Sequence, residues 1–172
     1  MELKKFIRTV KDFPEKGVKF KDISLLLANG EALHYTIDRM AELAEDADII
    51  VGPDARGFLF GTPVAAKLSK PFIMVRKKGK LPGKVISCNY GLEYGKNILE
   101  IQCGLVKPGQ KAVIIDDVLA TGGTLEAITK LLRDQNVEIL RIIVLMELEG
   151  FDARKRLPFD IQNLIYVKKD EE

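Results

Sequence analysis

Short apolar runs alternate with helical patterns along this chain, which is the order typical of βαβ units and a mostly parallel sheet. Apolar residues at helical spacing predict a first helix over residues 2–11 and a second that contains Leu33, Ile37, Met40 and Leu43. Further helices are predicted over residues 58–68 and 125–132, and core strands over residues 48–51, 72–75, 112–115, 139–145 and 164–167. The pattern therefore predicts an α/β fold in which helices flank a mostly parallel central sheet.

One segment, residues 85–101, interrupts this alternation with strand-like stretches around Gly91 and Gly95. We interpret it as an antiparallel excursion from the sheet. The chain has no internal repeat, low-complexity tract or linker, and 172 residues is the usual size of one domain. We therefore expect a single domain over residues 1–172.

The charge balance limits the kinds of partner that this protein can have. Lys and Arg number 27 and Asp and Glu 25, a net charge of +2, far below the excess typical of a protein that binds nucleic acid or an anionic membrane. No apolar run approaches the roughly 18 residues of a membrane span, and no signal-peptide pattern is present. Cys88 and Cys103 form no CxxC pair. We expect a soluble cytoplasmic protein that binds neither nucleic acid nor membrane.

The sequence contains a single histidine, His34, within the second predicted helix, where a surface or packing role is expected. A histidine-based catalytic triad or a histidine-rich metal site is therefore not expected in this protein. A Mg²⁺ site built from oxygen ligands remains open.

The strongest chemical signal is at residues 112–124, where an apolar strand leads through a turn with two glycines into a helix. In a parallel sheet such a turn lies at the carboxyl edge, where open α/β folds bind ligands. Gly122 and Gly123 allow backbone amides to approach a bound group. Thr121 and Thr124 add hydroxyl donors, and the helix N-terminus favours negative charge. These features predict a phosphate-binding loop, although neither the Walker pattern nor the dinucleotide fingerprint is present.

Asp116 and Asp117, at the predicted end of this strand, restrict the kind of phosphate compound. Carboxylates would repel a bare phosphate, but they suit a ligand whose hydroxyl groups lie a few ångströms from its phosphate. A sugar phosphate meets that requirement. The alternative interpretation is an acidic turn at a strand end, as in receiver domains that hold Mg²⁺ on paired acids.

The sequence resembles the type I phosphoribosyltransferases, whose motif for 5-phosphoribosyl-1-pyrophosphate has this order of apolar strand, two acids, ATGGT and helix. The resemblance covers nearly the whole chain. Its other blocks are residues 7–8 (IR), 12–14 (DFP), 17–18 (GV), 20 (F), 22–23 (DI), 52–61 (GPDARGFLFG), 75–83 (VRKKGKLPG) and 92–95 (LEYG). The last three blocks are typical of the members that act on adenine rather than on 6-oxopurines or pyrimidines.

This resemblance implies the type I phosphoribosyltransferase fold, with a small N-terminal hood at about residues 1–30 and a lid at about residues 76–101. It also implies transfer of phosphoribosyl from 5-phosphoribosyl-1-pyrophosphate to adenine, giving AMP and pyrophosphate. The implied cofactor is Mg²⁺, held mainly by pyrophosphate, ribose and water, and the implied assembly is a homodimer.

The resemblance also implies which residues bind 5-phosphoribosyl-1-pyrophosphate, the donor of the phosphoribosyl group. Asp116 and Asp117 would hold the ribose hydroxyls. The 5-phosphate loop would consist of Ala120, Thr121, Gly122, Gly123 and Thr124, and the pyrophosphate would contact Asp54, Ala55, Arg56, Arg76, Lys77 and Lys80. A cis peptide bond between Asp54 and Ala55 is also implied, and Arg56 would stabilise the charge of the departing pyrophosphate.

On the base side, the resemblance implies that Phe20 stacks on adenine beside Val18 and Lys21. Glu93 would be the acid/base residue for the ring nitrogens, with Tyr94 beside it. The chain departs from the family at Lys19, where an apolar residue is usual, and at Lys21, where Arg is common.

Three alternatives stay open. Residues 76–84 contain five cations and three Gly or Pro, a composition that is also common in solvated loops and incidental nucleic-acid patches. Glu93 could be an ordinary polar turn residue. The whole chain could act on another purine base, or could sense the ribosyl donor without catalysis.

Overall fold

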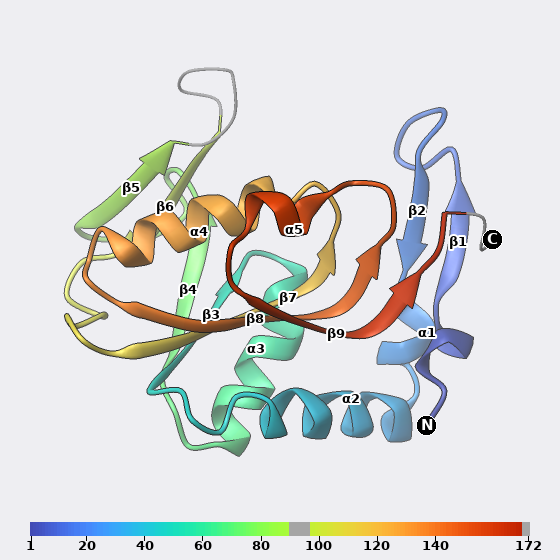
Figure 1. Ribbon diagram of the computed structural model, residues 1–172, viewed down its shortest axis with the longest axis horizontal. Coiled ribbons are helices and arrows are strands. Elements are labelled where there is room, and N and C mark those ends of the chain that lie inside the picture. The colour runs from blue at the N-terminus through green and yellow to red at the C-terminus, as the bar shows by residue number, and fades with distance from the viewer. Residues whose placement is uncertain (90–96, 170–172) are drawn as a thin grey trace.

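The computed structural model describes residues 1–89 and 97–169. Within these residues, a seven-stranded sheet with the order β5-β6-β4-β3-β7-β8-β9 forms the centre of the fold (Figure 1). Its strands are β3 (Ile49–Pro53), β4 (Phe72–Lys77), β5 (Val85–Asn89), β6 (Ile98–Gln102), β7 (Lys111–Leu119), β8 (Glu138–Leu148) and β9 (Asp160–Val167). The five strands β4, β3, β7, β8 and β9 pair in parallel, whereas β6 pairs antiparallel with both β4 and β5. The predicted α/β class, mostly parallel sheet and antiparallel excursion are confirmed.

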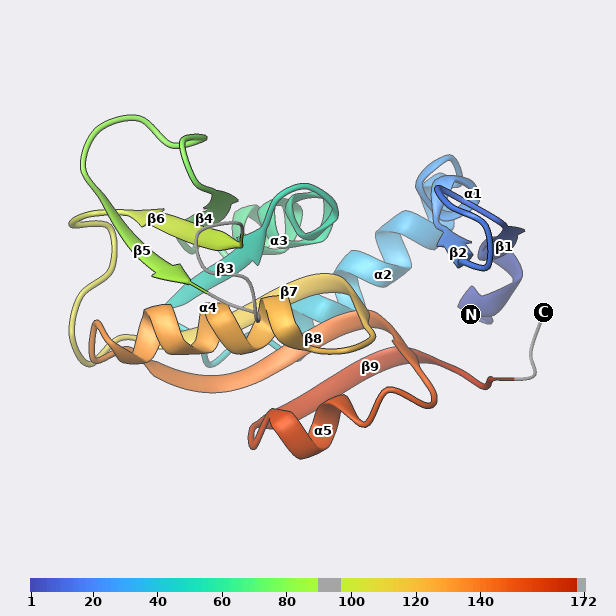
Figure 2. The same ribbon diagram turned by 90° about the horizontal axis from the view of Figure 1, so that it is seen from above.

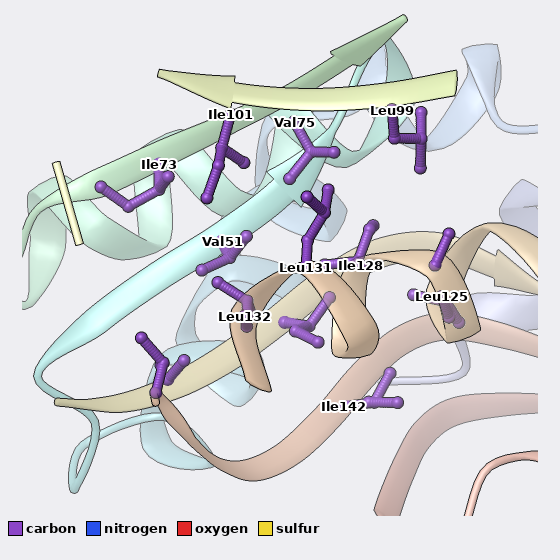
Figure 3. Packing of buried hydrophobic residues seen from close by; sticks show 14 of the residues in the cluster. Val51, Ile73, Val75, Leu99, Ile101, Leu125, Ile128, Leu131, Leu132 and Ile142 are labelled. Atoms are coloured by element: carbon purple, nitrogen blue, oxygen red, sulfur yellow. The ribbon is translucent and has the colours of Figure 1, made fainter. Parts of the chain in front are cut away.

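Helices cover both faces of the sheet, and Figure 2 shows α4 and α5 on one side and α2 and α3 on the other. Their bounds are α1 (Ser24–Leu27), α2 (Gly30–Glu42), α3 (Arg56–Lys67), α4 (Gly123–Arg133) and α5 (Ala153–Arg156). Val51 and Val75 of the sheet belong to one core cluster with Leu125 and Ile128 of α4 (Figure 3). Ile50 belongs to the second cluster, on the α2 and α3 side. Because both faces are buried, the central strands are nearly continuous apolar runs.

Residues 2–11 do not form the single helix that the periodicity predicted. Leu3–Phe6 is a short 3-10 helix with Leu3 in the core, and β1 (Arg8–Lys11) follows it and pairs antiparallel with β2 (Lys19–Asp22). The pairing is reinforced across the strands, because Lys21 Nζ donates a hydrogen bond to Thr9 Oγ1 at 2.7 Å. Long-range pairing therefore overrides the helical spacing, as it can for short segments.

Asp22 closes this two-stranded sheet at its end nearest the core. Both the hydroxyl and the amide of Ser24 donate to Asp22, and Arg8 Nη2 lies 2.5 Å from Asp22 Oδ2. These contacts, the Ser24 hydroxyl first, lower the pKa of Asp22 to about 2. The carboxylate therefore stays ionised at neutral pH and fixes the junction between β2 and α1.

The strand that carries the two acids is longer than the sequence predicted. β7 continues past residue 115 to Leu119, which lies opposite Glu147 of β8. Because β8 itself extends to Leu148, its backbone provides partners for the extra residues of β7. Asp116 and Asp117 therefore lie inside a strand rather than in a turn after it.

Among the described residues, no helix combines the length and the apolar character that crossing a bilayer requires.

Gly61 sets how closely α3 approaches β4. A Cβ built on Gly61 would lie 2.5 Å from Phe72 Cε2, whereas one built on Gly30 would meet no heavy atom within 4 Å. We predict that Gly61→Ala lowers the free energy of unfolding by about 1–3 kcal/mol, because the ring of Phe72 must move. Gly30→Ala should be neutral or stabilising by up to about 1 kcal/mol. Urea unfolding of both variants tests this, and equal stabilities would contradict it.

Candidate active site

The carboxyl ends of β3 and β7 lie side by side because the two strands pair in parallel, with Val51 opposite Ile114. The turns that follow these strands enclose a cleft of about 390 Å³. Its lining residues are Pro53, Asp54, Ala55, Arg56, Asp116, Asp117, Val118, Ala120, Thr121, Gly122, Gly123, Thr124 and Leu125. The structure therefore brings the 112–124 motif together with residues 54–56, which are more than 50 positions away in the sequence.

The loop between β7 and α4 forms one wall of the cleft. Gly122 has a φ of 81°, which an L side chain rarely adopts, and α4 begins at Gly123. The amides of a helix's first turn have no partner within that helix, so at the start of α4 they can bind an anion. A Cβ on Gly123 would meet no heavy atom within 4 Å, which leaves room for a ligand to approach the backbone. The loop has the geometry of a phosphate site.

The two acids lie on the floor of the cleft and differ in exposure. Asp117 is 3% exposed, and Asp116 is partly exposed and accepts a hydrogen bond from the amide of Asp117 at 2.8 Å. Burial and the neighbouring Asp117 carboxylate raise the pKa of Asp116 well above its usual range. Burial also raises the pKa of Asp117, although the Arg56 charge opposes that shift. A ligand that donates hydrogen bonds would favour the ionised form of both acids.

Arg56, in the first turn of α3, connects the two acids to the two-stranded sheet. Its Nε lies 2.9 Å from Asp117 Oδ2, and its Cζ lies 4.9 Å from the centre of the Phe20 ring. Phe20 is also in edge-to-face contact with Phe13, with ring centroids 5.2 Å apart. Arg56 therefore connects Phe20, the ring that the resemblance implies for the base, to the cleft.

The basic segment after β4 reaches the rim of the cleft. Arg76 Nε lies 2.9 Å from Asp54 Oδ2, and Arg76 Nη1 donates to the backbone oxygen of Lys80 at 3.1 Å. Lys77 and Lys80 have exposed side chains. The peptide bond between Asp54 and Ala55 is cis, as the resemblance implied.

Other predicted site residues lie apart from this cleft. Val18 and Lys21 line a second cavity, of about 770 Å³, together with Leu148 and Phe151 at the far ends of β8 and its following loop. Glu93 and Tyr94 lie outside the described residues. The structure thus brings residues 54–56, the 112–124 motif and Phe20 together, with Arg76 at the rim, and it places Val18 and Lys21 at a second cavity.

Sequence reasoning missed the support behind the phosphate loop. A Cβ on Gly122 would lie 3.2 Å from Leu157 Cδ1 and 3.3 Å from Ala153 Cβ, so α5 and the residue after it pack directly against the loop. Glu147 of β8 holds α5 by accepting two hydrogen bonds from Arg154, at 2.8 and 2.7 Å. An acid within the apolar run of residues 142–148 was the available signal.

The raised pKa of Asp116 predicts an unusual pH dependence of stability. Because the folded state binds this proton more tightly than the unfolded state, the contribution of Asp116 to stability is lost as pH rises above about 4. Asp116→Asn can still accept from the Asp117 amide, and we predict that its stability relative to the wild type increases between about pH 4 and 7.

Asp46 is the control, because its pKa is shifted in the opposite direction. The hydrogen bonds that Arg141 donates to Asp46 lower the pKa of this carboxyl. That contribution is present above about pH 4 and is lost at lower pH, so Asp46→Asn should lose stability at neutral pH. Urea unfolding across this pH range measures both variants. An Asp116→Asn variant that becomes relatively less stable as pH rises would contradict the assignment.

Comparison with known proteins agrees with this geometry. Residues 19–169 match the model of the phosphoribosyl transferase domain. The chain is 66% identical over 168 residues to the adenine phosphoribosyltransferase of Mycoplasmopsis pulmonis, a match that covers 97% of this chain and 99% of that protein. Among solved structures, the adenine phosphoribosyltransferase of Thermoanaerobacter pseudethanolicus is 47% identical, with a TM-score of 0.90 over 96% of this chain and 98% of that one.

The yeast enzyme from Saccharomyces cerevisiae is more distant in sequence. Its structure, a complex with adenine and an imino-altritol bisphosphate, is 34% identical, with a TM-score of 0.89 over 95% of this chain and 96% of that one. Because the family model and these near-full-length matches include the residues that line the cleft, the chain belongs to the phosphoribosyltransferase family and, within it, to the adenine phosphoribosyltransferases.

Proposed function

We propose that this protein catalyses the Mg²⁺-dependent transfer of phosphoribosyl from 5-phosphoribosyl-1-pyrophosphate to adenine, which yields AMP and pyrophosphate in purine salvage. The observation that carries the proposal is a single cleft in which two acids adjoin a phosphate loop and an arginine. Such a cleft suits a ligand with hydroxyls between two phosphate groups. The name and near-full-length similarity of the bacterial relatives support adenine as the acceptor.

The 5-phosphate binds to residues 120–124, where the first-turn amides of α4 and the hydroxyls of Thr121 and Thr124 can donate hydrogen bonds. The ribose hydroxyls donate to Asp116 and Asp117. Binding therefore brings these raised-pKa carboxyls fully into their ionised form.

Arg56 changes partner when the donor binds. Without ligand, its guanidinium lies against Asp117 and Phe20. A pyrophosphate beside the turn at Asp54 and Ala55 offers it a more highly charged partner. When Arg56 turns to the pyrophosphate, Asp117 is released for a ribose hydroxyl. Donor binding thus rearranges the contact between the cleft and Phe20.

The cleft also fits the Mg²⁺ ion that this family implies, since Asp54, Asp116 and Asp117 supply the hard oxygen ligands that this cation prefers. Among residues 1–89 and 97–169, no group of three His, Cys, Asp or Glu side chains is close enough together to hold a metal ion without other ligands. As the resemblance implies, the ion would be held mainly by oxygens of pyrophosphate, ribose and water, with these carboxylates close by. When bound, it neutralises charge on the departing pyrophosphate.

The reaction breaks the bond between the anomeric carbon and the pyrophosphate oxygen, and forms the bond from that carbon to adenine N9. The N9 proton is lost in the process. Arg56, Arg76, Lys77 and Lys80 stabilise the negative charge that develops on the leaving group. Glu93 acts as acid/base on the ring nitrogens, with Tyr94 beside it.

The adenine ring stacks on Phe20, with Lys21 in the same strand and Val18 just before that strand begins. Residues 1–30 then form a hood over the base, and residues 76–101 form a lid that excludes water from the reacting carbon. The edge-to-face contact between Phe13 and Phe20 supports this arrangement, because it holds the Phe20 ring in place.

We further propose that the protein is a cytoplasmic homodimer, with all 172 residues in one domain. Leu59 on α3 is 44% exposed and Met74 on β4 is 37% exposed. Met74 alternates with the core residues Ile73 and Val75, so it lies on the α3 side of the sheet. This apolar surface is suited to burial against a second copy.

Base selectivity is the first test of this function. Purified protein with Mg²⁺ and the donor should convert adenine in preference to hypoxanthine by up to about 10⁴-fold, because an oxo base leaves polar groups of the site unpaired. A spectrophotometric assay of each nucleobase measures the ratio. Comparable turnover of hypoxanthine would instead indicate a general purine enzyme, and donor binding without turnover of any base would indicate a sensor.

Substitution of Glu93 tests the acid/base assignment. Glu93→Leu and Glu93→Gln both remove the carboxylate, so both should lower single-turnover rates by about 10² to 10⁴. Glu138→Gln is the control, because Glu138 is exposed at the amino end of β8, the opposite edge of the sheet from the cleft. A full rate in the Leu variant would exclude a chemical role for Glu93.

A further inference from the structure

Glu100 is a buried carboxylate that the proposed reaction does not use. It is 4% exposed and lies in β6, between Leu99 and Ile101, which belong to the core cluster on the α4 side. Figure 3 shows those two neighbours among the packed core residues. Because side chains alternate along a strand, Glu100 lies on the opposite face. A buried carboxylate at that position is costly unless its oxygens have partners.

Glu100 has partners on two other segments. Its Oε2 accepts a hydrogen bond from the amide of Gly79 at 3.0 Å, and its Oε1 accepts one from Ser87 Oγ at 3.1 Å. In the sheet, Glu100 lies opposite Arg76 of β4 and Ser87 of β5. One side chain therefore joins β5, β6 and the turn that follows β4.

That turn carries the cations assigned to the pyrophosphate. Gly79 has a φ of 78°, and the amide of Lys80 donates to the carbonyl of Lys77 at 3.2 Å, which closes a tight turn. Arg76 in turn donates to the carbonyl of Lys80 and contacts Asp54 at the cleft. The bond to the Gly79 amide therefore holds the turn that places Lys80 beside Arg76 and Lys77 at the end of β4.

The charge of Glu100 has a second effect on the turn. Four of the five residues at 76–80 are Arg or Lys, and their mutual repulsion is greatest when no pyrophosphate is present. A fixed carboxylate bonded to the centre of the turn offsets that repulsion. Gln102, the next β6 residue on the same face, holds the same loop with a neutral contact, from its Nε2 to the backbone oxygen of Pro82 at 3.2 Å. Glu100 therefore gives this turn both a backbone anchor and a negative charge, whereas Gln102 gives it an anchor without charge.

We propose that Glu100 is a positioning residue for the donor: its charge and its bond to the Gly79 amide hold the turn at residues 77–80 so that Arg76, Lys77 and Lys80 face the pyrophosphate. This inference rests on the proposed function of the cleft. It extends that function by placing the control of pyrophosphate binding in a residue that touches no substrate.

The test uses Glu100→Gln, in which the amide can accept only one of the two hydrogen bonds and carries no charge. We expect KM for 5-phosphoribosyl-1-pyrophosphate, and the Kd for magnesium pyrophosphate by calorimetry, to rise about tenfold or more. KM for adenine should change less than threefold. Hydrogen exchange of the Gly79 amide should become faster in the same variant.

Two further variants separate this role from general support of the fold. Ser87→Ala removes the β5 contact but keeps the Gly79 contact, so its donor KM should stay within about threefold of the wild type. Glu100→Asp keeps the charge on a shorter side chain, so it should fold and give a donor KM between those of the wild type and Glu100→Gln.

The inference is overturned if both Glu100 variants bind magnesium pyrophosphate as the wild type does, or if Ser87→Ala is as impaired as Glu100→Gln. It is also overturned if the KM values for donor and adenine rise together with a fall in Tm. The calorimetric and exchange measurements need no turnover. A wild-type protein that binds magnesium pyrophosphate but converts no base would therefore contradict the proposed function and leave this inference standing.

Discussion

The parallel pairing of β3 with β7 is the constraint on which the site depends. After β3 the chain adds β4 on one side, and it then returns to place β7, β8 and β9 on the other. The strand order therefore reverses between β3 and β7, and the turns after these strands diverge and leave a crevice. The phosphate loop and residues 54–56 both lie at this crevice because of that reversal, whatever their distance along the chain.

The charged side chains of Asp116, Asp117 and Arg56 lie together at the crevice, and the two carboxylates lower the stability of the folded protein. Asp116 and Asp117 are adjacent and largely withdrawn from water, and both pKa values are raised, so the folded protein would be more stable without their charges. Arg56 offsets part of this cost through Asp117. The ligand that we propose has both donating hydroxyls and a pyrophosphate, so its site needs both signs of charge in place before the ligand arrives.

Support for the site comes from side chains that do not line it. The bidentate pair of Glu147 and Arg154 holds α5 against Gly122, and the contacts of Glu100 hold the turn at Gly79. Glu147 and Glu100 both lie within strands, so the sheet fixes the positions of their backbones. The loops that bind phosphate groups are therefore held from behind by buried carboxylates, which limits their movement without placing further negative charge in the cleft.

The sequence by itself determined the α/β class and the mostly parallel sheet, and it predicted the phosphate loop that we propose at residues 120–124. These features depend on local pattern: buried parallel strands are apolar throughout, and a glycine turn before a helix binds anions wherever it occurs. The similarity of the ATGGT and LEYG blocks to those of known enzymes added the expectation that adenine and 5-phosphoribosyl-1-pyrophosphate are the substrates.

Only the tertiary structure decided the remaining features. Residues 2–11 satisfy a helical period, yet β1 forms because β2, beyond the intervening turn, offers hydrogen bonds and an ion pair. β7 extends through both acids because β8 is long enough to pair with it. The contact of Arg56 with Phe20 and the partners of Glu100 likewise join segments that are distant in sequence. Such contacts arise from the packing of the whole chain, which no local pattern of residues encodes.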